Sequence, residues 1–188
     1  MIVMDTNKDW LIKSNLKINN CKKIIKNVTD NLIPIDLKLK STRGNYSKQY
    51  DLLLEFKKNN ELKSLLNIIK NHIFETLKTQ INYKFDLEIV SAWTVYGKKG
   101  SYHTVHRHND RKNLHISTIL YLDIPKNFND SDGAFYFFLN KNNDIEINTI
   151  IPKISDFIIM PVWIYHGVYP QTKGLRQTLN IDFAINFI

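Results

Sequence analysis

In residues 176–183, "RQTLNIDF", polar and apolar side chains alternate strictly from Thr178 onward. Arg176, Thr178, Asn180 and Asp182 form the polar set. The apolar set is Leu179, Ile181 and Phe183. Successive side chains of a β-strand point to opposite faces, so this segment is predicted to be a strand with one apolar and one polar face. In most β-sandwiches the polar set would face water, but around a central ligand site it can face inward.

Short segments of the same character fill the chain after residue 85. They are rich in β-branched and aromatic residues and are separated by turns containing Gly, Asn, Asp or Pro. They are "FDLEIVSAWTVY" (85–96), "SYHTVHRH" (101–108), "LHISTILYLDI" (114–124), "GAFYFFLN" (133–140), "DIEINTII" (144–151), "DFIIMPVWIYHGV" (156–168) and "RQTLNIDFAINFI" (176–188). About seven short strands of this kind predict an antiparallel sandwich or barrel.

The N-terminal part has a different periodicity. Between residues 61 and 79 apolar side chains recur at helical spacing, which predicts a helix with one buried stripe. We therefore expect one domain, residues 1–188, of the α+β class and mainly β. Residues 1–85 would be mainly helical support, backing a β core at residues 86–188.

Composition limits the protein classes that fit. The 188 residues are 43% hydrophobic and 23% charged, which is typical of a globular domain. A single cysteine, Cys21, excludes an internal disulfide and a Cys-rich zinc site. No stretch has the length of a signal peptide's apolar core or of a membrane span, so a cytoplasmic protein is expected. The formal net charge is +8, but the lysines are scattered, so a nucleic-acid partner is not favoured.

Residues suited to metal binding come in a defined order. The segment "VHRHND" (105–110) contains His106, His108 and Asp110, and His166 follows in "WIYHGVYP" (163–170). Residues i and i+2 of a strand point the same way, so two neighbouring ligands can face one metal. A third ligand from a distant strand completes a facial triad that leaves coordination positions open. Arg176 follows as a candidate anchor for a carboxylate.

These residues in this order resemble the iron(II)- and 2-oxoglutarate-dependent oxygenases, in particular the small ones of bacteria and phages. The resemblance is close over residues 93–180 and loose over residues 41–183. The matching residues are Trp93, Gly100, His106, His108, Ser117, Tyr121, Pro152, Asp156, His166, Pro170 and Arg176. Ser155, Asn109 and Thr178 depart from the family pattern, where glycine, proline and serine are usual. The family resemblance implies a double-stranded β-helix, also called a jelly roll, as found in cupins.

The metal ligands have two alternative assignments. In the first, His106, His108 and His166 bind iron, as the local resemblance and the offset from Gly100 to His106 favour. In the second, His108, Asp110 and His166 bind it, as the prevalence of a His-x-Asp pair in the wider superfamily favours. His108 and His166 belong to both assignments.

The resemblance also implies an activity. The chain would be an Fe(II)- and 2-oxoglutarate-dependent dioxygenase that uses O2 and releases succinate and CO2. It would hydroxylate a small molecule, an amino acid or a peptide side chain, with no membrane partner and with a homo-oligomer left open. Arg176, Thr178 and Tyr121 would bind the far carboxylate of 2-oxoglutarate. Two alternatives are a three-histidine dioxygenase that does not use 2-oxoglutarate and a jelly-roll protein that only binds metal.

Overall fold

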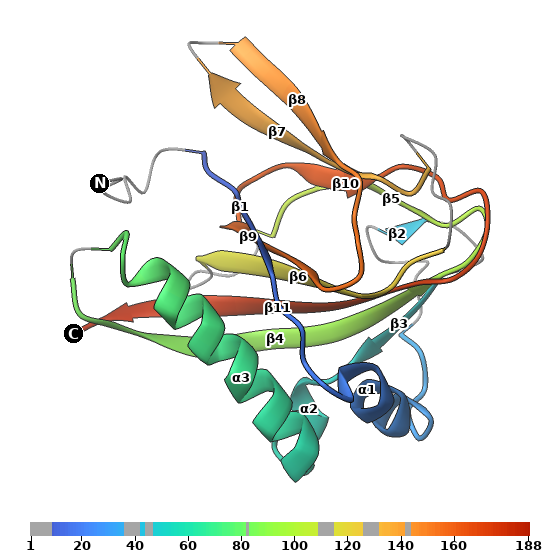
Figure 1. Cartoon of the computed structure of the whole chain (residues 1–188), viewed down its shortest axis with the longest axis horizontal. Helices are drawn as coiled ribbons and strands as arrows, with labels where there is room; N and C mark the ends of the chain where they lie inside the picture. Colours follow the sequence, from blue (N-terminus) through green and yellow to red (C-terminus); the bar gives the residue numbers. More distant parts are fainter. Residues whose placement is uncertain are drawn as a thin grey trace.

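Two antiparallel β-sheets lie face to face, and helices cover the outer face of one of them (Figure 1). This computed structural model describes residues 9–35, 42–43, 47–81, 83–108, 115–125, 132–141 and 144–188, with residues 42, 43 and 47 described by their backbone only. The major sheet has six strands in the order β1-β9-β6-β11-β4-β3, and the minor sheet has five in the order β2-β5-β10-β7-β8. This arrangement confirms the predicted jelly roll.

The strands of the major sheet differ greatly in length. They are β1 (Ile12–Asn15), β3 (Ser47–Asp51), β4 (Phe85–Gly97), β6 (Ile116–Asp123), β9 (Asp156–Pro161) and β11 (Arg176–Phe187). The strands of the minor sheet are β2 (Thr42–Arg43), β5 (Tyr102–His106), β7 (Phe135–Lys141), β8 (Asp144–Ile150) and β10 (His166–Val168). Strand β11 lies between β4 and β6, so its side chains reach the centre of the sandwich on one face.

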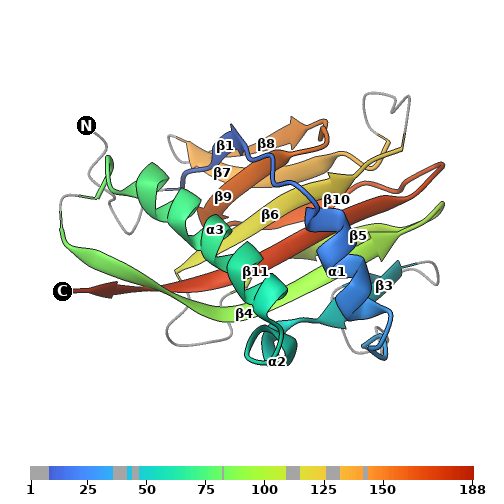
Figure 2. The ribbon, with the colours of Figure 1, turned by 60° about the horizontal axis from the view of Figure 1, so that its bottom comes forward.

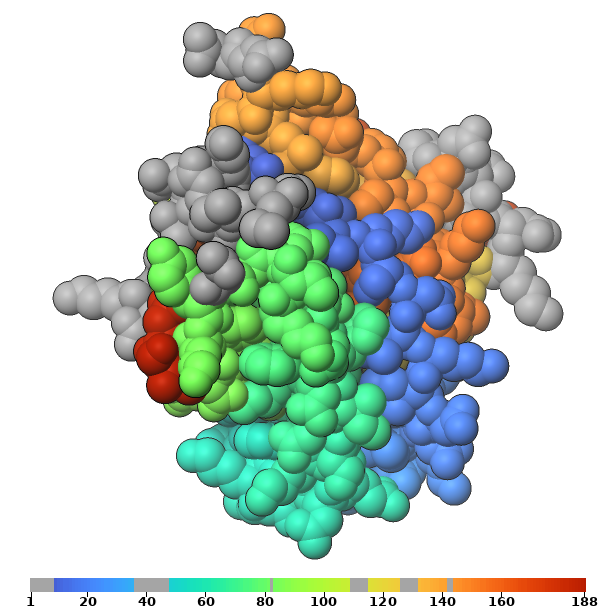
Figure 3. Space-filling model, turned by 60° about the vertical axis from the view of Figure 1, so that its left-hand side comes forward, coloured from blue at the N-terminus to red at the C-terminus, as the bar shows by residue number. Residues whose placement is uncertain are grey.

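Helices α1 (Cys21–Thr29), α2 (Leu53–Phe56) and α3 (Asn60–Leu77) lie on the outer face of the major sheet (Figure 2). Helix α3 begins at Asn59, whose Oδ1 accepts a hydrogen bond of 3.0 Å from the Leu62 backbone N–H. Its apolar stripe is fully buried, as its spacing predicts. Side chains of α3 and of the segment around α1 cover this side of the molecule (Figure 3).

Strand β11 separates a hydrophobic core from a polar interior. Leu179, Ile181 and Phe183 pack with the apolar stripe of α3 in one cluster. The alternate residues Arg176 and Asp182 are also buried, so they face the minor sheet and not water. The polar face of β11 is therefore directed inward, as a central ligand site requires.

The core between α3 and the major sheet should dominate stability. Phe157 of β9 is completely buried there, and its ring lies 5.4 Å from that of His72 on α3. Phe157→Ala should lower the free energy of unfolding by about 3–5 kcal/mol, because it removes buried apolar surface and leaves a cavity. Urea unfolding followed by circular dichroism measures this. Ile147→Ala on β8, where the side chain is 58% exposed, should change it by less than about 0.5 kcal/mol.

The N-terminal part contains strands as well as the helices expected there. Strand β1 pairs with β9, with Ile12 opposite Ile159, and β3 pairs with β4. With only four residues, β1 is too short for its alternation to be recognised in the sequence. Its position is determined by pairing with the edge of β9. Residues of α1, α3 and the C-terminal strands share one core cluster. Among the helices that the structure describes, none is long and apolar enough to span a membrane.

Candidate metal and co-substrate site

Three histidine rings lie close together between the two sheets, on the inner face of the minor sheet. His106, His108 and His166 each offer one ring nitrogen, and these three atoms lie within 4.8 Å of one another. The ring centroids are 4.4 Å apart for His106 and His166, 5.1 Å for His108 and His166, and 5.2 Å for His106 and His108. Three nitrogens at this spacing can bind a single metal ion.

Strand pairing places two of these rings side by side. His106 of β5 lies directly opposite His166 of β10, so the two side chains project from the same face. His108 follows the end of β5, and its backbone N–H donates to the Val162 carbonyl at 2.8 Å. This bond ties His108 to the segment between β9 and β10, and its ring lies close to the other two.

Hydrogen bonds to Nδ1 fix the orientation of each ring. The Nδ1 atoms of His106 and His166 lie 2.8 Å and 2.9 Å from the carbonyls of Thr104 and Ile164, two residues earlier in the chain. The Nδ1 of His108 lies 3.0 Å from Asp182 Oδ1 and 3.1 Å from Ser117 Oγ. Because the carbonyl and carboxylate oxygens can only accept, each Nδ1 donates, and each Nε2 keeps a free lone pair. The residues present therefore fit a divalent metal bound by three Nε2 atoms.

Burial favours the neutral, metal-binding form of two of these imidazoles. Desolvation lowers the pKa of His166 well below its ordinary value of 6.5, and the neighbouring His106 and His108 lower it further. Desolvation is also the largest cause of the lowered pKa of His106. A neutral imidazole is the form that binds a metal. These two rings therefore need not lose a proton when a metal binds near neutral pH.

Asp182 is a charged group that the sequence analysis did not assign to the site. It is buried, and its carboxylate accepts from His108 Nδ1 and, at 3.0 Å, from Ser91 Oγ. A carboxylate behind a ligating histidine fixes the tautomer and increases the basicity of the other nitrogen. It also compensates the charge of a metal that three neutral ligands leave unbalanced. The alternation of residues 176–183 was the available signal, since it placed Asp182 on the same face as Arg176.

Replacing Asp182 with asparagine should therefore weaken metal binding. Asp182→Asn keeps the side-chain shape but removes the charge behind His108, and we expect the dissociation constant for Fe(II) or Mn(II) to rise about 10–100-fold. Metal titration under anaerobic conditions measures it. Ser91→Ala removes only the second hydrogen bond to this carboxylate, so it should change affinity much less. Equal metal affinity in Asp182→Asn and the wild-type protein would contradict this role.

A second polar group lies at the other end of the β11 face. Arg176 is 2% exposed, and its Nη1 donates to the Gly133 carbonyl at 3.2 Å. Tyr121 of β6 is equally buried, and burial raises its pKa above the ordinary value, which keeps the hydroxyl protonated. Thr178 pairs with Tyr121 across the two strands. The three residues predicted to bind 2-oxoglutarate are thus brought together in the interior.

The guanidinium of Arg176 has no carboxylate partner within the part of the chain that the structure describes. A buried charge without a counter-ion is costly, so such a group normally pairs with an anion. Arg176 and the three histidines lie on the same interior, between the two sheets. A dicarboxylate that binds a metal at one end and a guanidinium at the other matches this arrangement.

Asp110, the alternative third ligand, is one of residues 109–114, which lie outside the described part of the chain. The structure brings His106 to His108 and His166, but the choice between the two triads remains a prediction. His103 was assigned no role from the sequence, and its ring also lies near the cluster, 6.1 Å from that of His106.

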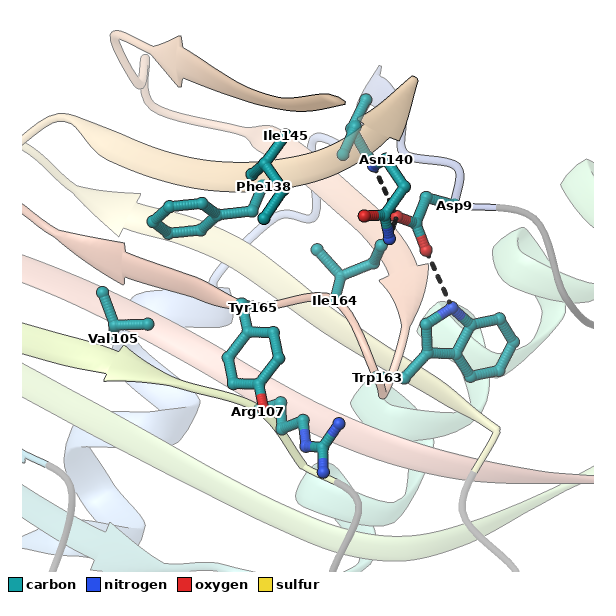
Figure 4. Close-up of a pocket in the computed structure, with 10 residues that line it drawn as sticks. Asp9, Val105, Arg107, Phe138, Asn140, Ile145, Trp163, Ile164 and Tyr165 are labelled. Atoms are coloured by element: carbon teal, nitrogen blue, oxygen red, sulfur yellow. Dashed lines mark hydrogen bonds between the residues drawn. The ribbon is translucent and has the colours of Figure 1, made fainter. Parts of the chain in front are cut away.

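A groove of about 410 Å³ opens on the opposite face of the minor sheet (Figure 4). Val105 and Arg107 line it, and they alternate along the chain with His106 and His108. The guanidinium carbon of Arg107 lies 4.9 Å from the centre of the Tyr165 ring. Val105 and Arg107 therefore point away from the histidine cluster, and the groove opens on the other side of β5.

Comparisons with known proteins agree with this site. Residues 91–182 match the family model described as "Putative 2OG-Fe(II) oxygenase". That range contains His106, His108, His166, Arg176 and Asp182. A comparison with curated proteins found no match.

Solved structures with a similar fold cover nearly the whole chain. A prolyl-4-hydroxylase from Pseudomonas putida is 13% identical, with a TM-score of 0.67 over 97% of this chain and 96% of that one. A Trichoplax adhaerens prolyl hydroxylase, solved with a peptide fragment of a hypoxia inducible factor, is 15% identical, with a TM-score of 0.69 over 96% and 85%. The collagen prolyl hydroxylase of Paramecium bursaria Chlorella virus-1, solved with 2-oxoglutarate, is 16% identical, with a TM-score of 0.64 over 93% and 96%.

At these identities the solved structures show the fold, and the family match covers residues 91–182 of the 188. Over that segment, which contains the three histidines and Arg176, the chain is similar to the iron(II)- and 2-oxoglutarate-dependent oxygenases, which are oxidoreductases.

Proposed function

We propose that this protein is an iron(II)- and 2-oxoglutarate-dependent oxygenase that hydroxylates a carbon atom of a small molecule, an amino acid or a peptide side chain, with His106, His108 and His166 as its iron ligands. The observation that supports this most strongly is the set of three ring nitrogens within 4.8 Å, each presented by a hydrogen bond to the other nitrogen of its ring. Iron and 2-oxoglutarate supply the oxidising chemistry when bound, and the reaction consumes one O2 and one 2-oxoglutarate and releases succinate and CO2.

In this proposal the chain's own residues bind and orient. The three imidazoles would occupy one face of the metal and leave the rest to co-substrate and oxygen. Arg176 would form two parallel hydrogen bonds to the far carboxylate of 2-oxoglutarate, and Thr178 and Tyr121 would contribute their hydroxyls. Aromatic and apolar side chains of the interior, including Trp93, whose ring lies 5.5 Å from that of His108, would exclude water.

For the substrate, we propose testing prolyl peptides and free amino acids first. Two solved structures of similar fold are prolyl hydroxylases whose names specify a peptide or collagen substrate. We also propose that the enzyme acts in the cytoplasm, because a chain with a single cysteine suits a reducing compartment.

The central experiment is an anaerobic titration of the metal-free protein with Fe(II), followed by addition of 2-oxoglutarate. A weak visible charge-transfer band that appears only after 2-oxoglutarate is added would show that both ligands bind at one centre. Succinate release under O2, stimulated by the correct substrate, would then identify what is oxidised. Metal binding with no spectral response to 2-oxoglutarate and no succinate would favour the three-histidine dioxygenase or the inert metal-binding protein.

A further inference from the structure

A β-bulge in the minor sheet turns an additional histidine into the site. Strand β10 pairs with β5 so that His166 lies opposite His106, and Val168 lies opposite His103. Two steps along β10 therefore correspond to three steps along β5, which is the mark of a bulge. Residues three apart on a regular strand would point to opposite faces, but the extra residue returns His103 to the face of His106 and His166.

The imidazole of His103 has an unused polar atom in this interior. Its Nε2 is buried and has no hydrogen-bond partner among the described residues. Its ring centroid lies 6.1 Å from that of His106. Val168, its cross-strand neighbour, packs against the apolar cluster between the sheets. A buried ring nitrogen without a partner destabilises the free protein, so it points to a ligand that supplies the missing bond.

The guanidinium of Arg176 lies near the same segment. A Cβ atom built on Gly97 would stand 3.5 Å from Arg176 Nη2 and 3.3 Å from Ser101 Cβ. The head of Arg176 is therefore adjacent to the turn that leads from β4 into His103. The electrostatic influence of Arg176 on His103 agrees with this proximity, because, after desolvation, it is the next cause of the lowered pKa of His103. A guanidinium offers only N–H donors, and a neutral imidazole whose Nε2 carries the proton offers one more, so an anion can satisfy both groups.

We propose that His103 helps to position the co-substrate: its Nε2–H donates a hydrogen bond to the carboxylate of 2-oxoglutarate that Arg176 binds. This inference rests on the proposed function, since it assumes that 2-oxoglutarate binds between the histidine cluster and Arg176. It adds a donor from the minor sheet to a carboxylate that the major sheet holds through Arg176, Thr178 and Tyr121. The co-substrate would thus connect the two sheets.

The test measures co-substrate binding and not turnover. Anaerobic Fe(II)-loaded protein is titrated with 2-oxoglutarate and with 2-oxopentanoate, which has the same chain length but a methyl group in place of the far carboxylate. His103→Phe keeps a ring and removes the donor, so it should raise the dissociation constant for 2-oxoglutarate about tenfold. It should leave that for 2-oxopentanoate within about twofold. His103→Gln places an amide nitrogen near the position of Nε2 and should restore most of the affinity.

Val168→Ala is the matched control, because it alters packing beside His103 without removing a polar group. It should affect both ligands equally and weakly. Thermal unfolding and Fe(II) affinity are measured for every variant, and His103→Phe should bind Fe(II) as the wild-type protein does. Equal loss of affinity for both ligands, or a loss of Fe(II) affinity in His103→Phe, would overturn the proposal. If the wild-type protein bound no 2-oxoglutarate, the proposed function itself would fail.

Discussion

Replacing His166 with alanine should abolish tight iron binding and reduce succinate formation to background. His166 is 4% exposed, its Nδ1 is fixed by the Ile164 carbonyl, and its ring is the nearest neighbour of both other rings. Two imidazoles cannot complete a facial triad, so we expect Fe(II) affinity to fall more than about a hundredfold. This loss should exceed the loss predicted for Asp182→Asn, which removes only the partner of a ligand. Anaerobic metal titration and a succinate assay measure the two effects.

A matched variant separates loss of a ligand from loss of any buried histidine. His72→Ala removes an imidazole on α3 that contacts Ser14 and Phe157 on the other face of the major sheet, so it should leave metal affinity unchanged. His106→Ala and Asp110→Ala decide between the two triads, since only the true third ligand should reproduce the effect of His166→Ala. Tight iron binding by His166→Ala would reject both triads.

The fold could be predicted from periodicity wherever elements are long. The stripe of α3 and the alternation of β11 are repeated often enough to identify a helix and a strand. Strand β1 was missed because four residues carry too little pattern, and its position depends on pairing with β9. Which face of β11 is covered was left open, because a period of two shows that the faces differ but not which one lies inside.

The site shows the same division between local pattern and tertiary structure. His106 and His108 could be placed on one side of a strand because they are two residues apart. His103 is three residues from His106, so a regular strand would place it on the opposite face, and only the bulge opposite His166 and Val168 brings it to the same face. Asp182 was recognised as part of the polar face that also carries Arg176, but its contact with His108 joins residues 74 apart in the chain. Sequence spacing within a strand or helix cannot predict a contact of this kind.

Replacing Arg176 should separate co-substrate binding from metal binding. We expect Arg176→Met to raise the dissociation constant for 2-oxoglutarate at least about a hundredfold, because the buried far carboxylate would lose its only proposed counter-charge, a loss of about 3–5 kcal/mol. Arg176→Lys keeps the charge but loses the planar pair of donors, so its affinity should lie between those of Arg176→Met and the wild-type protein. Fe(II) affinity should not change in either variant. The charge-transfer band of the anaerobic iron protein provides the titration signal.

The unfolding temperature shows whether Arg176→Met loses 2-oxoglutarate affinity because a ligand contact is lost or because the protein is misfolded. Arg176 is buried and has no carboxylate partner in the described part of the chain, so Arg176→Met should not lower, and should even raise, the unfolding temperature of the protein without 2-oxoglutarate. The increase in unfolding temperature that 2-oxoglutarate gives the wild-type protein should be lost in this variant. Lys173→Met removes an exposed positive charge three residues away and should retain full 2-oxoglutarate affinity. Wild-type affinity in Arg176→Met would mean that the far carboxylate binds elsewhere, whereas a destabilised variant would mean that the guanidinium stabilises the fold through its hydrogen bond to the Gly133 carbonyl.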